Sequence, residues 1–248
     1  MKNRKLICVI LAAGMGTRMK SDLPKVLHPV AGEPMVRHVI RAAETLTPDE
    51  MIVVIGPGMD AVADAVAPHP TIVQTDRLGT GHAVKTALMG RDLIGTDVLV
   101  LFGDVPLTPP TSLQDLVARH RADDHPAVTI LAMQPNDPTG YGRLIRNTAD
   151  YVTAVIEEID ATPAERAITI CSSGMMILRG DHLNAALAAI KNDNAKGEYY
   201  LLDVLPVLCA NGSVAAYTLG PADDLNGVND RAQLATIEAR YQEKRAKK

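Results

Sequence analysis

Hydrophobic and polar positions alternate along the first half of the chain in blocks that predict a regular series of strands and helices. Four short runs have the length and composition of strands, and glycine closes three of them: residues 6–13, 51–55, 71–75 and 97–102. Between these runs, apolar residues recur at helical spacing after Pro34, over 60–66 and over 80–89. Strands that alternate with helices are typical of a parallel sheet with helices on both faces.

The second half is less regular but contains no long linker, internal repeat or low-complexity segment. Helical patterns cover 113–121, 181–191, 201–209 and 230–245, and strand patterns cover 128–133, 143–145, 152–157, 175–178 and 214–219. We therefore predict an α/β fold with a Rossmann-like, doubly wound, mostly parallel sheet and a smaller second lobe. The predicted domain spans residues 1–229, with halves of about 1–110 and 111–229, and a C-terminal helix or tail over 230–248. The charged end of that tail is expected to be a solvated helix face; a truncated linker to a further domain is the alternative.

Composition narrows the class of protein. Apolar residues make up 47% of the chain and aromatic residues 3%, so the core must be aliphatic, as in strands buried on both faces. A net charge of −4 gives no basic field that would attract nucleic acid or an anionic membrane, so any phosphate binding must be local. Cys8, Cys171 and Cys209 lie far apart, which fits a reducing, cytoplasmic location. Residues 6–13 follow a basic N-terminus, yet they lead directly into a loop, so we interpret them as a strand and not as a signal peptide. No apolar run reaches the ~20 residues that cross a bilayer.

The segment from Leu11 to Lys25 has the features of a phosphate-binding loop. It contains Gly14-Met15-Gly16-Thr17-Arg18, followed by Pro24-Lys25, directly after a predicted buried strand. Glycines let the backbone approach a ligand closely, and successive backbone N–H groups can hold anionic oxygens. A Walker A loop is excluded because Lys25 follows proline, and a dinucleotide fingerprint is excluded because its third glycine is missing. The segment therefore favours local binding of a phosphorylated ligand.

This segment resembles the L-x-A-G-x-G-T-R…P-K signature of sugar-nucleotide pyrophosphorylases. More closely, the chain is similar over nearly its whole length to the N-terminal uridyltransferase domain of the bifunctional N-acetylglucosamine-1-phosphate uridyltransferases/glucosamine-1-phosphate acetyltransferases of bacteria. Six ordered segments carry the resemblance: residues 21–28, 78–83, 102–107, 137–143, 197–200 and 227–229. It implies that UTP and N-acetylglucosamine 1-phosphate react to give UDP-N-acetylglucosamine and pyrophosphate, a step of peptidoglycan precursor synthesis, with Mg²⁺ as cofactor.

The resemblance also implies roles for individual residues. Arg18 and Lys25 are the expected catalytic cations. The expected nucleotide-binding residues are Leu11, Ala12, Ala13, Gly14, Gln74, Gly79, Thr80, Phe102 and Gly103, the expected sugar-binding residues are Gly142, Glu157 and Ser172, and the expected metal ligands are Asp104 and Asn229. Oxygen ligands of this kind suit Mg²⁺. Taken alone, Gly103-Asp104 reads as a turn and Asn229 as the N-cap of the last helix, and His82 is interpreted as structural.

Two departures from the family pattern fall in the acceptor half. The pattern E-x-K-D-A reads Glu157-Glu158-Ile159-Asp160-Ala161, and Ser172 stands where the family has asparagine. A paralogous nucleotidyltransferase with another acceptor is therefore one alternative, and a catalytically silent nucleotide-sensing domain is another. In the family, a left-handed β-helix of hexapeptide repeats follows this domain. No such repeats occur here, so no acetyltransferase is expected and no oligomeric state follows from the sequence.

Overall fold

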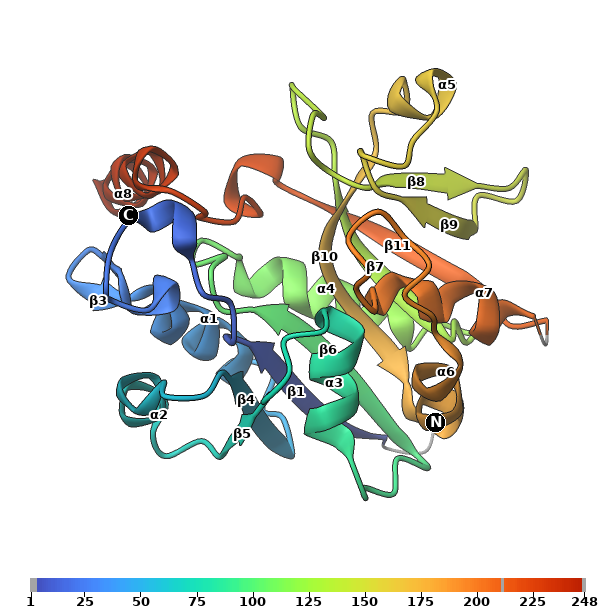
Figure 1. Ribbon diagram of the computed structural model, residues 1–248. Coiled ribbons are helices and arrows are strands. Elements are labelled where there is room, and N and C mark those ends of the chain that lie inside the picture. Colours follow the sequence, from blue (N-terminus) through green and yellow to red (C-terminus); the bar gives the residue numbers. More distant parts are fainter. Residues whose placement is uncertain (1–3, 211, 247–248) are drawn as a thin grey trace.

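The computed structural model describes residues 4–210 and 212–246, and its centre is a nine-stranded mixed sheet (Figure 1). Four neighbouring strands run parallel: β6 (Thr96–Phe102), β1 (Lys5–Leu11), β4 (Glu50–Ile55) and β5 (Thr71–Val73). On the other side of β6 follow β10 (Cys171–Arg179), β7 (Val128–Met133) and β11 (Ala215–Gly220). β10 is antiparallel to both of its neighbours, β6 and β7, whereas β11 is parallel to β7.

Alternate residues of β1 face opposite layers of helices, as expected of a strand buried on both sides. Leu6, Cys8 and Ile10 pack in a cluster with α1 (Met35–Glu44), α2 (Asp60–Val66) and α4 (Pro110–His120). Ile7 and Val9 pack in a second cluster with α3 (Thr80–Leu88), α6 (Leu183–Ala189) and α7 (Val204–Cys209). Helices therefore cover both faces of the sheet, and the predicted doubly wound, mostly parallel α/β class is confirmed.

The second half builds a lobe on one end of β10. A hairpin of β8 (Arg143–Arg146) and β9 (Val152–Ile156) joins the sheet where Arg143 pairs with Cys171. The short helix α5 (Pro163–Arg166) follows, closed by a reciprocal capping box of Thr162 and Glu165. Figure 1 shows this hairpin and α5 rising away from the helix-covered sheet.

Several elements differ from those that the sequence pattern predicts. The strand expected over 175–178 extends to Cys171, with a register shift between Ser172 and Met176. The helices expected over 181–191 and 201–209 each begin as a 3₁₀ turn, η3 (Gly180–His182) and η4 (Leu201–Asp203). Short elements absent from the sequence interpretation are the hairpin β2 (Pro29–Val30) and β3 (Glu33–Pro34), α5, and the 3₁₀ turns η1 (Thr17–Met19), η2 (Lys25–Leu27) and η5 (Ala222–Asp224). Such short elements have little periodicity of their own.

The C-terminal helix α8 (Arg231–Ala246) packs against the N-terminal part of the chain. Ile237 joins a small buried cluster with Met19 and Val30. The Glu238 carboxylate accepts a hydrogen bond from the backbone N–H of Ala31 at 2.6 Å. Arg240 donates to the nearly buried carboxylate of Asp224 at 2.8 Å. These charged side chains therefore attach the helix to the body of the domain, although the division at residue 229 stays a prediction. None of the helices within 4–210 and 212–246 combines the length and the apolar character needed to cross a membrane.

Candidate active site

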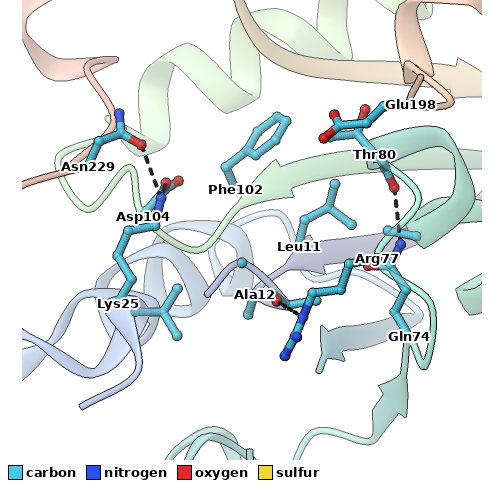
Figure 2. Close-up of a pocket in the computed structure, with 15 residues that line it drawn as sticks. Leu11, Ala12, Lys25, Gln74, Arg77, Thr80, Phe102, Asp104, Glu198 and Asn229 are labelled. Carbon is cyan, nitrogen blue, oxygen red and sulfur yellow. Dashed lines mark hydrogen bonds and ion pairs between the residues drawn. The ribbon is translucent and has the colours of Figure 1, made fainter. Parts of the chain in front are cut away.

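A cavity of about 430 Å³ opens at the carboxyl ends of the parallel strands, where ligands bind in open α/β sheets. Figure 2 shows Lys25, Asp104 and Asn229 grouped at one end and Gln74, Thr80 and Glu198 at the other. Most of the lining residues come from the ends of β1 and β6, from the segments after β1, β5 and β6 and from the start of α3, and two come from the segments before η4 and α8. The lining consists of Leu11, Ala12, Ala13, Gly14, Lys25, Val26, Gln74, Arg77, Gly79, Thr80, Ala83, Phe102, Asp104, Glu198 and Asn229.

The glycine-rich loop folds back onto Lys25. Gly16 has a φ of +63°, and a Cβ atom there would lie 2.5 Å from the Cβ of Lys25, so only glycine fits. The start of the loop is fixed to the sheet, because Ala12 donates to the Val54 carbonyl at 2.8 Å. Arg18 lies in η1 with its side chain exposed, and it is not among the residues that line the cavity. The structure therefore brings Lys25 to the cavity and leaves Arg18 outside its wall.

Lys25, Asp104 and Asn229 meet although they lie far apart in the sequence. The Lys25 ammonium forms an ion pair with Asp104 Oδ2 and a 3.2 Å hydrogen bond to Asn229 Oδ1. The Lys25 and Asp104 side chains are only 14% and 16% exposed, so solvent screens this pair weakly. At the start of α8, Asp230 accepts from the Gln233 N–H at 2.9 Å and acts as the cap. The N-cap interpretation of Asn229 is therefore wrong, and its side-chain oxygen faces Lys25 instead.

Two oxygens that converge on one cation have the chemistry of a metal site. The ammonium of Lys25 takes the place of that cation here, so the oxygens of Asp104 and Asn229 fit a small hard ion. Among the residues that the structure describes, no group of three or more His, Cys, Asp or Glu side chains could hold a metal. The pair would therefore supply only two protein ligands, which suits Mg²⁺ because it retains waters and binds substrate phosphates.

Gln74 is fixed in position at the other end of the cavity. Its side chain is 4% exposed, and its Nε2 donates to the Gly79 carbonyl and to His82 Nδ1, both at 3.1 Å. Both amide hydrogens are thus engaged inside the protein, and Oε1 is left as the hydrogen-bonding atom for a ligand. His82 therefore supports Gln74, in agreement with its structural interpretation.

The turn before α3 needs glycine. Gly79 has a φ of +109°, and a Cβ atom there would lie 2.6 Å from the Tyr199 carbonyl oxygen. Tyr199 also donates to the Leu78 carbonyl at 2.8 Å, and the Leu201 N–H donates to Thr80 Oγ1 at 3.0 Å. This end of the cavity is therefore built from two chain segments, which are tied by a backbone hydrogen bond and by the bond to the Thr80 side chain.

The three expected sugar-binding residues lie together on the smaller lobe. The Ser172 N–H donates to the Gly142 carbonyl at 2.8 Å, and a Cβ atom on Gly142 would lie 3.4 Å from Glu157 Oε1. Ser172 Oγ accepts from the Gly174 N–H at 3.0 Å, so its oxygen is used within its own turn. Desolvation raises the pKa of Glu157 above the ordinary range, the nearby Lys196 ammonium lowers it, and the carboxylates of Asp160 and Asp203 raise it further.

A second cavity of about 400 Å³ adjoins Glu157. It is lined by Gly140, Glu157, Glu158, Ile159, Arg166 and Lys196. Ile159, which replaces the lysine of the family pattern, is 60% exposed there. Arg166 donates to the Glu158 backbone carbonyl at 3.3 Å. Two cations, Arg166 and Lys196, therefore line the same cavity as Ile159, the residue that replaces a lysine of the family pattern.

Some residues of the main cavity were not among the site residues expected from the sequence. Val26 and Ala83 add apolar wall, Glu198 adds a carboxylate and Arg77 adds a guanidinium. Gly103, an expected nucleotide-binding residue, is buried and donates to the Leu11 carbonyl at 3.0 Å, so it joins two strand ends. Arg77 could have been noticed because it lies inside the segment from Gln74 to Thr80, but no spacing rule marks it.

Comparison with known proteins finds a matching family model, similar curated proteins and similar solved structures. The model of the MobA-like NTP transferase domain matches residues 8–175. The bifunctional protein GlmU of Rhodospirillum rubrum is 52% identical over 237 residues, which are 95% of this chain and 52% of that protein. GlmU of Paramagnetospirillum magneticum is 46% identical over 98% of this chain and 54% of its own length. The chain thus spans about half the length of the curated relatives it matches.

Solved structures agree on the fold. A UDP-glucose pyrophosphorylase complexed with UDP-glucose superposes with a TM-score of 0.75 and 17% identity, covering 97% of this chain and 99% of the other. HddC from Yersinia pseudotuberculosis, complexed with GMP-PN, superposes with a TM-score of 0.67 and 19% identity, covering 95% and 99%. At these identities the likeness concerns the arrangement of strands and helices.

Proposed function

Because the chain belongs to the family of MobA-like NTP transferase domains, we propose that this nucleotidyltransferase joins UTP and N-acetylglucosamine 1-phosphate to form UDP-N-acetylglucosamine and pyrophosphate. The observation that carries the proposal is the cavity that joins a glycine-rich loop, a fixed glutamine and the Lys25–Asp104–Asn229 group. The motif resemblance and the relatives at 46–52% identity support this choice of substrates.

Uracil fits the base end of the cavity by its hydrogen-bonding pattern. The Gln74 amide nitrogen is engaged by Gly79 and His82, so its oxygen is an acceptor for a ligand N–H. The N3 position of uracil carries a hydrogen, whereas N3 of cytosine is itself an acceptor. Backbone groups of Leu11 to Gly14 would hold the ribose and the start of the phosphate chain.

The proposed reaction is an in-line substitution at the α-phosphorus of UTP. An oxygen of the sugar phosphate forms a bond to that phosphorus, the bond to the β-phosphate oxygen breaks, and pyrophosphate leaves with the electron pair. The attacking phosphate is already ionised at neutral pH, so no protein base is needed, and positioning with charge neutralisation is enough. Lys25 and the loop N–H groups would supply fixed positive charge and dipoles at the phosphates, and Arg18 would join them from η1.

Asp104 and Asn229 would hold Mg²⁺, which supplies charge neutralisation at the transferring phosphate and at the leaving group. The Lys25 ammonium now lies between these two residues, so it would have to give up their oxygens when the metal binds. It would then be free to turn toward the phosphate chain.

The acceptor half would bind the sugar through Gly142, Glu157 and Ser172. A half-buried, ionised Glu157 would accept hydrogen bonds from sugar hydroxyls. Ser172 favours a second candidate, a paralogue with another phosphorylated acceptor, because its oxygen is engaged with Gly174 and its reach is shorter than that of asparagine.

A substrate panel tests both candidates. Pyrophosphate release would be measured with UTP, CTP and GTP against N-acetylglucosamine 1-phosphate, glucosamine 1-phosphate and glucose 1-phosphate, with and without Mg²⁺. We expect release with UTP and N-acetylglucosamine 1-phosphate that EDTA abolishes. Preference for a different sugar phosphate would favour the paralogue, and no release with any pair would refute a catalytic function.

A further inference from the structure

The nucleotide cavity contains one cation that neither the loop motif nor the metal pair accounts for. Arg77 lies in the segment between β5 and α3, and its side chain lines the cavity. Figure 2 shows it running from the side of Gln74 toward Ala12. It thus crosses from the base end of the cavity to the start of the phosphate loop.

The guanidinium is held by two independent contacts. Its Nε donates to the Ala13 carbonyl at 2.9 Å, which ties it to the end of β1. A Cβ atom on Gly56 would lie 2.3 Å from Arg77 Nη2 and 2.9 Å from Cζ, so the guanidinium rests on the bare Cα of Gly56 at the end of β4. Any larger residue at position 56 would displace it.

The two terminal nitrogens of Arg77 remain available. Across residues 4–210 and 212–246, neither of them donates a hydrogen bond to the protein, and no carboxylate lies within 4.0 Å of the group. Each terminal nitrogen carries two N–H donors in a fixed plane. The sequence has therefore placed a positioned but unpaired guanidinium beside the loop that begins at Gly14.

Charge balance shows why the cavity needs this group. Lys25 is paired with Asp104, and Glu198 adds a second carboxylate to the wall. Without Arg77, the formal charge of the lining side chains would be −1, which opposes binding of a triphosphate. With Arg77 the formal charge of the lining side chains is zero. The Arg77 guanidinium, which has no carboxylate partner among the described residues, lies beside Ala13 at the start of the glycine-rich loop.

We infer that Arg77 is a third phosphate-binding cation of the nucleotide site, which contacts the phosphate chain of the bound nucleoside triphosphate through its terminal nitrogens. This rests on the proposed function as a nucleotidyltransferase for UTP. Arg77 contributes in two ways. Its terminal nitrogens bind the phosphate chain, and its Nε holds the peptide group between Ala13 and Gly14 in place by donating to the Ala13 carbonyl.

Binding measurements on the whole chain can separate the two contributions. UTP, uridine and inorganic triphosphate would be titrated without metal into the wild type and into Arg77→Met and Arg77→Lys. Loss of a hydrogen bond to a charged group should weaken binding of UTP and of inorganic triphosphate by roughly tenfold to a hundredfold in Arg77→Met. Uridine binding should change less than about twofold, and Arg77→Lys should retain part of the affinity for triphosphate, since it keeps the charge and loses the fork.

The matched control is Arg37→Met. Arg37 also donates to a backbone carbonyl, that of Ala67 at 3.3 Å, but it lies on α1 and lines no part of the nucleotide cavity. This control should bind all three ligands as the wild type does, and unfolding midpoints would be compared for every variant.

Equal weakening of uridine and UTP in Arg77→Met would overturn the inference, because it would leave only the support of the loop. Unchanged binding of UTP would overturn it as well. In either case the proposed function stands if the wild type binds UTP and releases pyrophosphate from it. A wild type that does not bind UTP would refute both.

Discussion

Replacing Lys25 by methionine should separate metal binding from turnover. Methionine keeps much of the length of the side chain but removes the ammonium that contacts Asp104 Oδ2 and, at 3.2 Å, Asn229 Oδ1. A metal ion that uses the same two oxygens must first displace this ammonium. We therefore expect Lys25→Met to bind a divalent metal more tightly in the absence of nucleotide, and to be a poorer enzyme.

The size of the effect follows from the contact that is lost. Hydrogen bonds to charged groups contribute about 1.5–3 kcal/mol, and this pair is more than four-fifths buried, so screening reduces it little. Each 1.4 kcal/mol is about a tenfold change in an equilibrium constant. Metal affinity should thus rise by roughly tenfold to a hundredfold, while pyrophosphate release falls by about a hundredfold or more, on the scale of a lost transition-state donor.

Mn²⁺ serves as a paramagnetic probe for the measurement. Free Mn²⁺ would be followed by electron paramagnetic resonance during titration of nucleotide-free wild type, Lys25→Met and Asp104→Asn. Asp104→Asn should no longer bind Mn²⁺ at this site, so the Mn²⁺ that binds to the wild type but not to this variant is the Mn²⁺ held by Asp104. If Lys25→Met binds Mn²⁺ no more tightly than the wild type, the ammonium and the metal do not compete, and the reasoning is refuted.

Three further predictions concern other parts of the molecule. His82→Phe removes the acceptor at 3.1 Å from Gln74 Nε2, so the ratio of kcat/KM for UTP over CTP should fall severalfold; an unchanged ratio would show that Gln74 keeps its orientation unaided. Desolvation raises the pKa of Glu157, so KM for the sugar phosphate should rise as the pH falls through that raised pKa, and Glu157→Gln should have a high KM without this pH dependence. Burial lowers the pKa of His120 to about 4 from about 6.5 when unfolded, so the unfolded state takes up this proton first as the pH falls. Stability should therefore be full above pH 6.5 and decrease by up to about 3 kcal/mol toward pH 4; urea unfolding at several pH values should show a smaller decrease in His120→Gln, and equal pH dependence would contradict the assignment.

Local sequence decided most of the elements, because their signals are local. The apolar run at residues 6–13 contains β1, whose alternate residues pack against the two helix layers. Glycine follows this run, so the glycine-rich loop begins at the carboxyl edge of the sheet. The helix over 60–66 and the strand over 128–133 have the bounds that the pattern predicts. Where elements are short, as in β2, β3 and α5, the pattern is too brief to indicate a period, and they were not predicted.

The position of β10 was decided by the tertiary structure. Its residues read as an ordinary apolar strand, and nothing in the pattern shows that it enters between β6 and β7 with the opposite direction. The end of β10 pairs with β8 through Cys171 and Arg143, so the position of β10 also decides where the hairpin of β8 and β9, which leads to Glu157, joins the sheet. Sheet order depends on which apolar faces pack best across the whole chain, and that is a long-range property.

The sequence by itself thus determined the loop, the fold class and the family. Each of these depends on signals that span only a few residues: glycines, a proline–lysine pair and the patterns of single strands and helices. Only the tertiary structure showed that Lys25 contacts residues 79 and 204 positions away, and that Arg77 reaches back 64 positions to Ala13. These contacts depend on the direction in which each side chain points, and that direction is set by packing and by the charges that the side chain can reach. No spacing rule along the chain predicts it. For that reason the position of the Lys25 ammonium between Asp104 and Asn229, and the placement of the Arg77 guanidinium at the cavity wall, became visible only in the folded molecule.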